Sequence, residues 1–169
     1  MCSFIEQCSN LITHVKEISK EDIYAELSEE VFGFIHDEIR TAAESGRDPA
    51  GRMRKIGETL LALSDSHKMY YDFIDYFLST PEIIFPDDIK ALVDINGRRI
   101  IDTIAGVIQQ GVDAGKFRKV DPKNFALIFI GNLHGFIHFK KLNKTILKNQ
   151  NFRDLYSKNI DCFIKGISR

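Results

Sequence analysis

Apolar residues recur every three or four positions along nearly the whole chain, and this helical period limits its fold more than any other feature. One stripe contains Ile23, Leu27, Val31 and Phe34. Apolar side chains at this spacing share one face of an α-helix. No segment shows the apolar–polar alternation that is typical of a β-strand, and the four prolines stand apart. The pattern therefore predicts an all-α fold rather than many short strands.

Helix start and stop signals divide the chain into six sizeable helices after Ser19, with a short one before it. The expected ranges are 19–45, 52–63, 70–77, 86–115, 125–142 and 151–167. Ser19 and Asp121 suit N-cap positions, and Gly115 suits a left-handed C-cap. Pro86 and Pro122 suit the first helical position. Gly46 and the Asp48-Pro49 turn are expected to end the first long helix.

The length and the cysteines indicate one cytoplasmic domain. A chain of 169 residues buries enough surface to fold without a disulfide or a metal. Cys2, Cys8 and Cys162 form an odd set without framework spacing, which favours a reducing compartment. The N-terminus lacks the features of a signal peptide. The longest apolar stretch, 125–139, contains polar residues and is too short to span a bilayer, so no membrane partner is expected.

Charge is distributed unevenly along the chain. Residues 1–45 hold 10 acidic and 3 basic side chains, a net charge of −7, whereas residues 46–119 are balanced. Residues 120–169 hold 3 acidic and 9 basic side chains, a net charge of +6. Proteins that bind nucleic acids usually present a basic face. An acidic N-terminal third is therefore unsuited to lie on phosphates.

Two segments resemble the TetR family of transcriptional regulators. The segment 19–27, SKEDIYAEL, is similar to the start of the fourth helix of that family. The segment 108–122, IQQGVDAGKFRKVDP, is similar to the element between the seventh and eighth helices, with Phe117 folded back as an anchor. The small residues Gly131 and Gly135 follow where the eighth helix of the family has them. The resemblance covers about residues 19–168 and implies a helical effector-binding and dimerisation domain.

The resemblance ends at the front of the chain. A helix-turn-helix head needs three helices, on the order of 45 residues. Only 18 residues precede Ser19. We interpret residues 1–18 as a remnant or degenerate end of such a head, and residues 19–169 as the effector-binding and dimerisation domain. The two explanations are a truncated sequence and a genuine loss of the head.

The resemblance implies an internal pocket for a small, mostly apolar effector. Asn96 and His134 interrupt apolar stripes, and a buried polar group needs a partner. That partner is a ligand, a backbone carbonyl or a water molecule. For the aromatic residues, the alternative to contact with a ligand is packing in the core. The predicted effector-binding residues are Met69, Tyr70, Phe73, Phe77, Asn96, Ile100, Phe129 and His134.

Neither a metal nor another cofactor is expected. His134 and His138 stand four apart on one helix face, which is a spacing found in metal sites. A third ligand would have to come from elsewhere, such as His67 or Asp102, and the E-x-x-H motif of di-iron bundles does not occur. The sequence also lacks recognisable catalytic motifs, so we do not expect an enzyme. A metal-dependent helical-bundle enzyme remains a third hypothesis, which rests on these two histidines.

The resemblance also implies that the last two helices pair with their symmetry mates in a homodimer. The apolar surplus of these helices suits this role, because a lone domain would leave it exposed. The alternative is that both stripes are covered within one subunit. The predicted interface residues are Phe125, Ile128, Gly131, Gly135, Phe139, Phe152, Tyr156, Ile160 and Phe163.

The leading functional hypothesis is a TetR-type transcriptional regulator that responds to a ligand. Its DNA binding, inferred by kinship, would depend on a head that this chain does not contain. The alternative is a headless helical module that binds a small molecule or dimerises without binding DNA.

Overall fold

A computed structural model describes residues 20–79, 87–142, 144–148 and 150–169. It confirms the all-α fold class, with six α-helices in this part of the chain. The predictions for residues 1–18, the Ser19 cap and Pro86 lie outside the described residues. No helix within the described ranges is long and apolar enough to cross a membrane.

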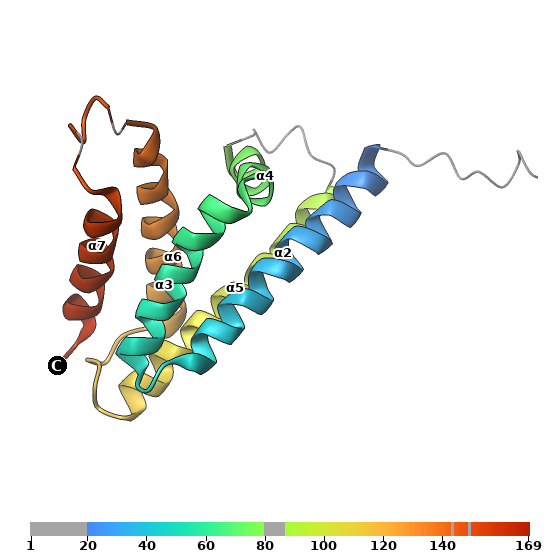
Figure 1. The fold of residues 1–169 in the computed structure, drawn as a ribbon. Helices are drawn as coiled ribbons and strands as arrows, with labels where there is room; N and C mark the ends of the chain where they lie inside the picture. Colours follow the sequence, from blue (N-terminus) through green and yellow to red (C-terminus); the bar gives the residue numbers. More distant parts are fainter. Residues whose placement is uncertain (1–19, 80–86, 143, 149) are drawn as a thin grey trace, which may run out of the picture.

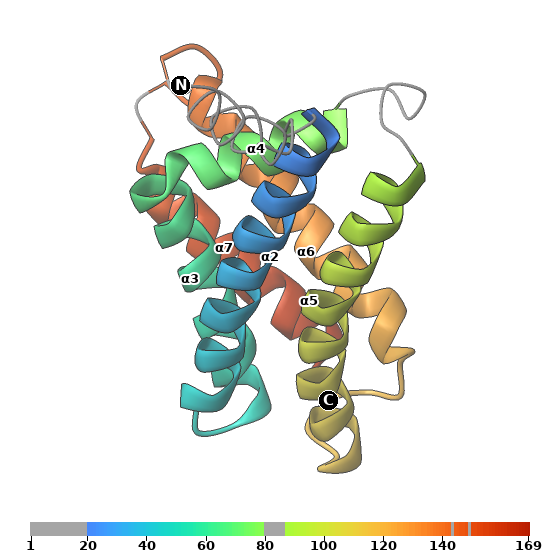
Figure 2. The same ribbon diagram turned by 90° about the vertical axis from the view of Figure 1, so that its right-hand side faces the viewer.

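Two long helices form the centre of the molecule. Helix α2 (Lys20–Ser45) and helix α5 (Asp87–Asp113) run side by side in the same direction (Figures 1 and 2). The predicted stripe on α2 faces inward from its middle onward, since Val31 is 0% exposed, whereas its first residue, Ile23, is 53% exposed. On α5, Ile104 is likewise 0% exposed. Burial of these side chains supplies the main driving force for pairing the two helices.

Helix α3 (Pro49–Ser66) returns beside α2 and begins earlier than predicted. Asp48 is its N-cap and accepts a hydrogen bond from the backbone N–H of Gly51 at 2.7 Å. Pro49 then occupies the first turn. The predicted start at residue 52 was wrong because Asp48-Pro49 begins the next helix as well as ending the turn.

Helix α4 (Lys68–Ser79) is short and crosses one end of the α2–α5 pair (Figure 2). None of its residues is fully buried, although several of its aromatic side chains pack against the core. The predicted break before it is present, but α3 extends to Ser66 and His67 is its C-cap. Helix α4 therefore lies on the rest of the bundle as a cover.

The turn that connects α5 to helix α6 (Pro122–His138) has the conformation and caps that the sequence predicts. Gly115 has a φ of 66°, the left-handed conformation predicted for a C-cap. Phe117 folds back and is 1% exposed. Asp121 caps α6 by accepting hydrogen bonds from the N–H groups of Lys123 and Asn124 at 2.9 and 3.1 Å. These three predictions are confirmed.

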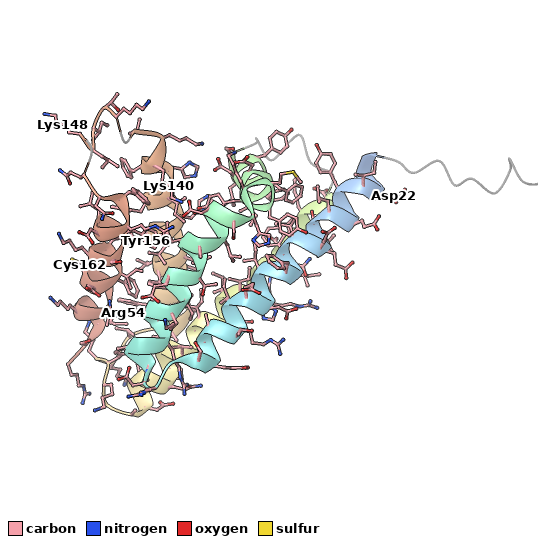
Figure 3. All side chains as sticks on the ribbon, viewed as in Figure 1. Asp22, Arg54, Lys140, Lys148, Tyr156 and Cys162 are labelled. Carbon is pink, nitrogen blue, oxygen red and sulfur yellow. The ribbon has the colours of Figure 1, made fainter. Side chains whose placement is uncertain are left out.

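Helices α6 and α7 (Phe152–Ile167) run antiparallel, with α6 packed mainly on α5 and α7 against α3 and α6 (Figures 1 and 2). The 3₁₀-helix η2 (Phe139–Leu142) continues α6, so the last predicted turn of that helix is not α-helical. Tyr156 points inward from α7, whereas Cys162 lies on its outer side (Figure 3). The chain end is fixed to the α5–α6 turn, because the Arg118 N–H donates to the Ile167 carbonyl at 2.8 Å.

Candidate functional site

The side chains of α4 contact α2 on one side and α6 on the other. Toward α2, the ring of Tyr70 lies 5.4 Å from that of Phe34, and its hydroxyl donates to the Glu30 carboxylate. Phe73 of α4 also approaches α2, where its ring centroid lies 6.5 Å from that of Tyr24. These aromatic contacts cover the α2 segment from residue 24 to residue 34.

Two buried polar atoms lie in the helix pair at this level. Ser28 Oγ on α2 and Asn96 Nδ2 on α5 have no hydrogen-bond partner among the described residues. Ser28 is 0% and Asn96 5% exposed. An unpaired buried polar group is costly, on the order of 1–3 kcal/mol. Unpaired groups of this kind are therefore candidates for contact with a bound molecule.

The helix register places these two residues at the same height. His36 Nε2 on α2 lies 3.2 Å from Thr103 Oγ1 on α5. Ser28 precedes His36 by about two helical turns, and Asn96 precedes Thr103 by about two turns. Because the helices are parallel, both residues lie toward the α4 end of the pair. We call Ser28, Asn96, Tyr70 and Phe73 the α4-covered site.

The predicted effector-binding residues lie in different parts of the structure. Asn96 and Ile100 are buried on α5, and Tyr70, Phe73 and Phe77 are half-buried on α4. Phe129 is fully buried but packs on Phe163 of α7, with ring centroids 4.8 Å apart. Met69 is 81% exposed on the outer face of α4. Ser28 was missed because a serine within an acidic helix gives no signal of burial in the sequence.

His134, the remaining predicted residue, belongs to a polar cluster between α4 and α6. Its Nε2 lies 3.4 Å from His138 Nε2 and 3.7 Å from Asp75 Oδ1. His138 Nε2 lies 2.8 Å from the same Asp75 oxygen. Burial lowers the pKa of His134, the neighbouring His138 lowers it further, and Asp75 partly opposes both. We call Asp75, His134 and His138 the α4–α6 cluster.

The third member of this cluster differs from the two that the sequence suggested. His67 packs its ring against Phe34 at 4.7 Å, and Asp102 pairs with Lys123 at 3.0 Å. Asp75 joins the histidines instead, since α4 lies across α6 at this point. Sequence spacing alone cannot bring together two helices that are separated by α5.

The predicted dimer residues lie partly on an open face and partly in the core. Tyr156 and Ile160 are 0% and 1% exposed within the single chain. Phe125, Phe152 and Phe163 are half-buried. The exposed members all belong to α6 and the start of η2, and they are Ile128, Gly131, Gly135 and Phe139.

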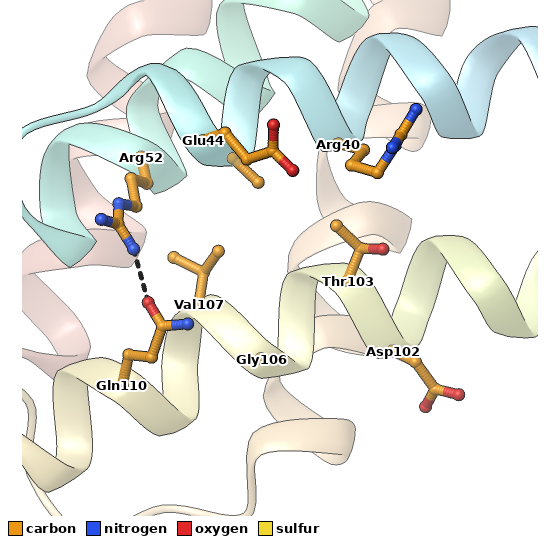
Figure 4. A pocket seen from close by; sticks show the side chains of 9 residues that line it. Arg40, Glu44, Arg52, Asp102, Thr103, Gly106, Val107 and Gln110 are labelled. Carbon is orange, nitrogen blue, oxygen red and sulfur yellow. Dashed lines mark hydrogen bonds between the residues drawn. The ribbon is translucent and has the colours of Figure 1, made fainter.

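A polar groove lies between α2 and α5 at the end remote from α4 (Figure 4). It has a volume of about 330 Å³ and is open to solvent. Charged residues of both signs line it, including Arg40, Glu44 and Asp102. Arg52 closes one end by a hydrogen bond to Gln110. This mixed polar lining does not suit a mostly apolar effector.

Comparisons with known proteins identify the fold. No family model matches the sequence, and a search of curated proteins finds no relative. A protein of unknown function from Rhodococcus sp. RHA1 is similar with a TM-score of 0.76 and 15% identity, over 92% of this chain and 77% of that one.

Two further solved structures are TetR-family regulators. AibR, in complex with isovaleryl coenzyme A and operator DNA, matches with a TM-score of 0.64 and 15% identity. The match covers 95% of this chain and 80% of AibR. SmeT, the repressor of the Stenotrophomonas maltophilia multidrug efflux pump SmeDEF, matches with a TM-score of 0.61 and 14% identity. This match covers 88% of this chain and 82% of SmeT. The chain therefore has the helical fold of the TetR-family transcriptional regulators.

Proposed function

We propose that this chain is the effector-binding and dimerisation body of a TetR-type transcriptional regulator. The observation that carries the proposal is the pair of unpartnered polar atoms, Ser28 Oγ and Asn96 Nδ2, which are buried in the α2–α5 pair toward the end that α4 crosses. The fold shared with AibR and SmeT supports it. The lack of a recognisable catalytic motif and the regulatory roles of these neighbours argue against an enzyme.

The chemistry of the α4-covered site suggests what the effector contains. Asn96 Nδ2 is a hydrogen-bond donor, and Ser28 Oγ can donate or accept. Tyr70 and Phe73 offer aromatic surface where α4 contacts Phe34 and Tyr24 of α2. We infer a small, largely apolar compound with a carbonyl or carboxylate oxygen that accepts from Asn96. Ordinary ligand pockets combine these features, an apolar wall with a few orienting polar groups.

The position of α2 provides the route from effector to DNA. The α4-covered site includes α2, and α2 leads toward the N-terminal segment where regulators of this fold carry their DNA-reading head. An effector that moves α2 against α5 would change the spacing of two heads in a homodimer. Effector and DNA affinities would then be reciprocally coupled. DNA binding would require a head N-terminal to α2.

The variant Asn96→Leu tests this proposal. Leucine keeps the branched shape of asparagine and removes the unpaired amide, so the ligand-free protein should gain about 1 kcal/mol in stability. The same change should abolish the rise in melting temperature that a ligand produces. The measurement is a thermal-shift screen of the wild type and the variant with isovaleryl coenzyme A and a library of apolar carboxylates and ketones.

Asn132→Leu is the matched control, because Asn132 lies on the exposed side of α6 and donates to Asn159 at 3.0 Å. It should leave any ligand response unchanged. A ligand response that survives in Asn96→Leu would place the effector elsewhere. No response of the wild type to any compound would remove the support for an effector-binding body.

A further inference from the structure

Three donor atoms of the α4–α6 cluster converge on one point. The edges of the triangle formed by Asp75 Oδ1, His134 Nε2 and His138 Nε2 measure 2.8, 3.4 and 3.7 Å. Two ligands of a tetrahedral zinc ion stand about 3.3 Å apart, since Zn–N and Zn–O bonds of about 2.0 to 2.2 Å meet at the tetrahedral angle. The observed triangle therefore needs shifts of about half an ångström to accept such an ion.

The convergence follows from helix geometry on both sides. His134 and His138 are four residues apart and share one face of α6. Tyr71 and Asp75 are also four apart and share the face of α4 that lies on α6. The cluster thus joins two helices by side chains of fixed spacing. In the described residues no other group of three histidine, cysteine, aspartate or glutamate side chains is as close together.

Tyr71 holds His134 in the orientation that a metal ligand requires. The Tyr71 hydroxyl lies 2.8 Å from His134 Nδ1, and the two rings are stacked with centroids 5.1 Å apart. In the tautomer that leaves Nε2 unprotonated toward the cluster, Nδ1–H would donate to the Tyr71 oxygen. Histidine ligands commonly donate their second ring N–H to an outer partner, which fixes tautomer and ring orientation. This contact is independent of the triangle of donor atoms.

The charges around the cluster leave Oδ1 of the Asp75 carboxylate available to an ion. Lys141 Nζ lies 3.5 Å from Asp75 Oδ2, the oxygen that the histidines do not contact. The Lys141 side chain is 70% exposed, so solvent screens its repulsion of a bound cation and it can move away. The three cluster side chains are 21 to 34% exposed, which gives an ion access from solvent.

We propose that Asp75, His134 and His138 bind a zinc-class divalent transition-metal ion between α4 and α6. Imidazole nitrogen and carboxylate oxygen are suitable zinc donors, and three protein ligands leave a fourth position for water or a small molecule. The ion fastens α4, the cover of the α4-covered site, to α6. The proposal does not rest on effector binding, because its donor atoms and its probe are different.

Titration of the metal-stripped chain with Zn²⁺, followed by isothermal calorimetry, tests the proposal. We expect one ion per chain. Cobalt titration should give the intense visible bands of a four-coordinate Co²⁺ ion with nitrogen and oxygen ligands. Asp75→Ala, His134→Ala and His138→Ala should each weaken Zn²⁺ binding by more than about a hundredfold. Tyr71→Phe should weaken it by roughly tenfold, as expected for an outer partner.

Matched variants separate the cluster from other metal-binding side chains. His67→Ala and Asp72→Ala remove a histidine and an aspartate outside the cluster, and both should leave the affinity unchanged. Lys141→Met should raise it, because a competing cation is removed. Circular dichroism establishes that each variant is folded, and Asp75→Asn substitutes for Asp75→Ala if the alanine variant is not.

Two results would overturn the metal site. One is the failure of the folded wild type to bind Zn²⁺ at micromolar concentrations. The other is binding that persists in Asp75→Ala and His138→Ala, which would place the ion elsewhere. Either result would identify the cluster as a hydrogen-bonded ion pair of Asp75 with His138 and Lys141. Zinc binding without any effector response would contradict the proposed function alone.

Discussion

Gly111 has a packing role that its place in a helix does not suggest. A Cβ atom built on it would lie 2.1 Å from Cδ2 of Phe117, well inside contact distance. The Phe117 ring is 1% exposed, so it has little room to move. The N–H groups of Lys116 and Phe117 also both donate to the Gly111 carbonyl at 2.9 Å. Gly111 therefore fixes the return of the chain from α5 toward α6.

The variant Gly111→Ala should lower the free energy of unfolding by about 1–3 kcal/mol, because the added methyl overpacks the Phe117 site. Gly106→Ala is the control, since its added Cβ meets nothing within 4 Å on the same helix. That variant should gain roughly 0.5–1 kcal/mol from helix propensity. Urea unfolding measures both, and equal effects of the two substitutions would refute this role of Gly111.

The role of a single residue could be predicted from the sequence where that role depends only on neighbouring positions in the chain. Gly115 and Asp121 act through their own turn, so their cap roles followed from residue type and position. The role of Asp75 was not predictable, because its partners lie 59 and 63 positions away on α6. Ser28 was missed because a serine within an acidic helix gives no signal of the burial that the structure shows. The predicted effector set accordingly included Asn96 but also the exposed Met69.

Among the helices, α4 has the weakest attachment. It has 12 residues, none of them fully buried, and isolated helices of this length are marginal in water. It contacts α3, packs aromatic rings on α2 and contributes to the α4–α6 cluster. An element with few buried side chains opens at lower free energy than the core of the same protein.

We expect the backbone amides of α4 to exchange with solvent faster than those of α5 and α6. Hydrogen exchange followed by mass spectrometry measures this difference directly. The centre of α5 is the internal reference, since Ile104 and Ile108 are fully buried. Exchange of α4 as slow as that of the α5 centre would contradict its description as a cover.

The presence of each helix was easier to predict than the residues at which it begins and ends. Apolar periodicity depends only on the chain, and all six helices appear where it placed them. The start of α3 and the end of α6 were wrong by about one turn. Asp48-Pro49 suits both the end of a turn and the start of a helix, and here it serves as both. Helix termini generally vary by this amount.

Among the described residues, helix α6 presents an apolar face that the chain itself does not cover. Leu127 and Ile128 are both 54% exposed on α6, and Phe139 is 41% exposed just after it. Gly131 and Gly135 lie on the same helix, and a Cβ on either would meet nothing within 4 Å. Small residues between large apolar ones allow a second helix to approach closely. This face is the surface through which we propose the homodimer forms.

Replacing Gly131 by arginine tests this face without disturbing the fold of one chain. The added side chain has open space in the monomer, but two copies would meet across a symmetric interface. We expect the dimer dissociation constant to rise by at least about a hundredfold. Gly106→Arg, also exposed and on α5, is the matched control and should leave the dimer intact.

Native mass spectrometry of the purified chain, alone and with the compound library, tests the central claim most directly. It reports the number of chains and the number of bound small molecules in one spectrum. An effector-binding and dimerisation body should appear at twice the 19.4 kDa mass of the chain and gain one compound per chain. A 19.4 kDa species that binds no compound at any concentration tested would contradict the account.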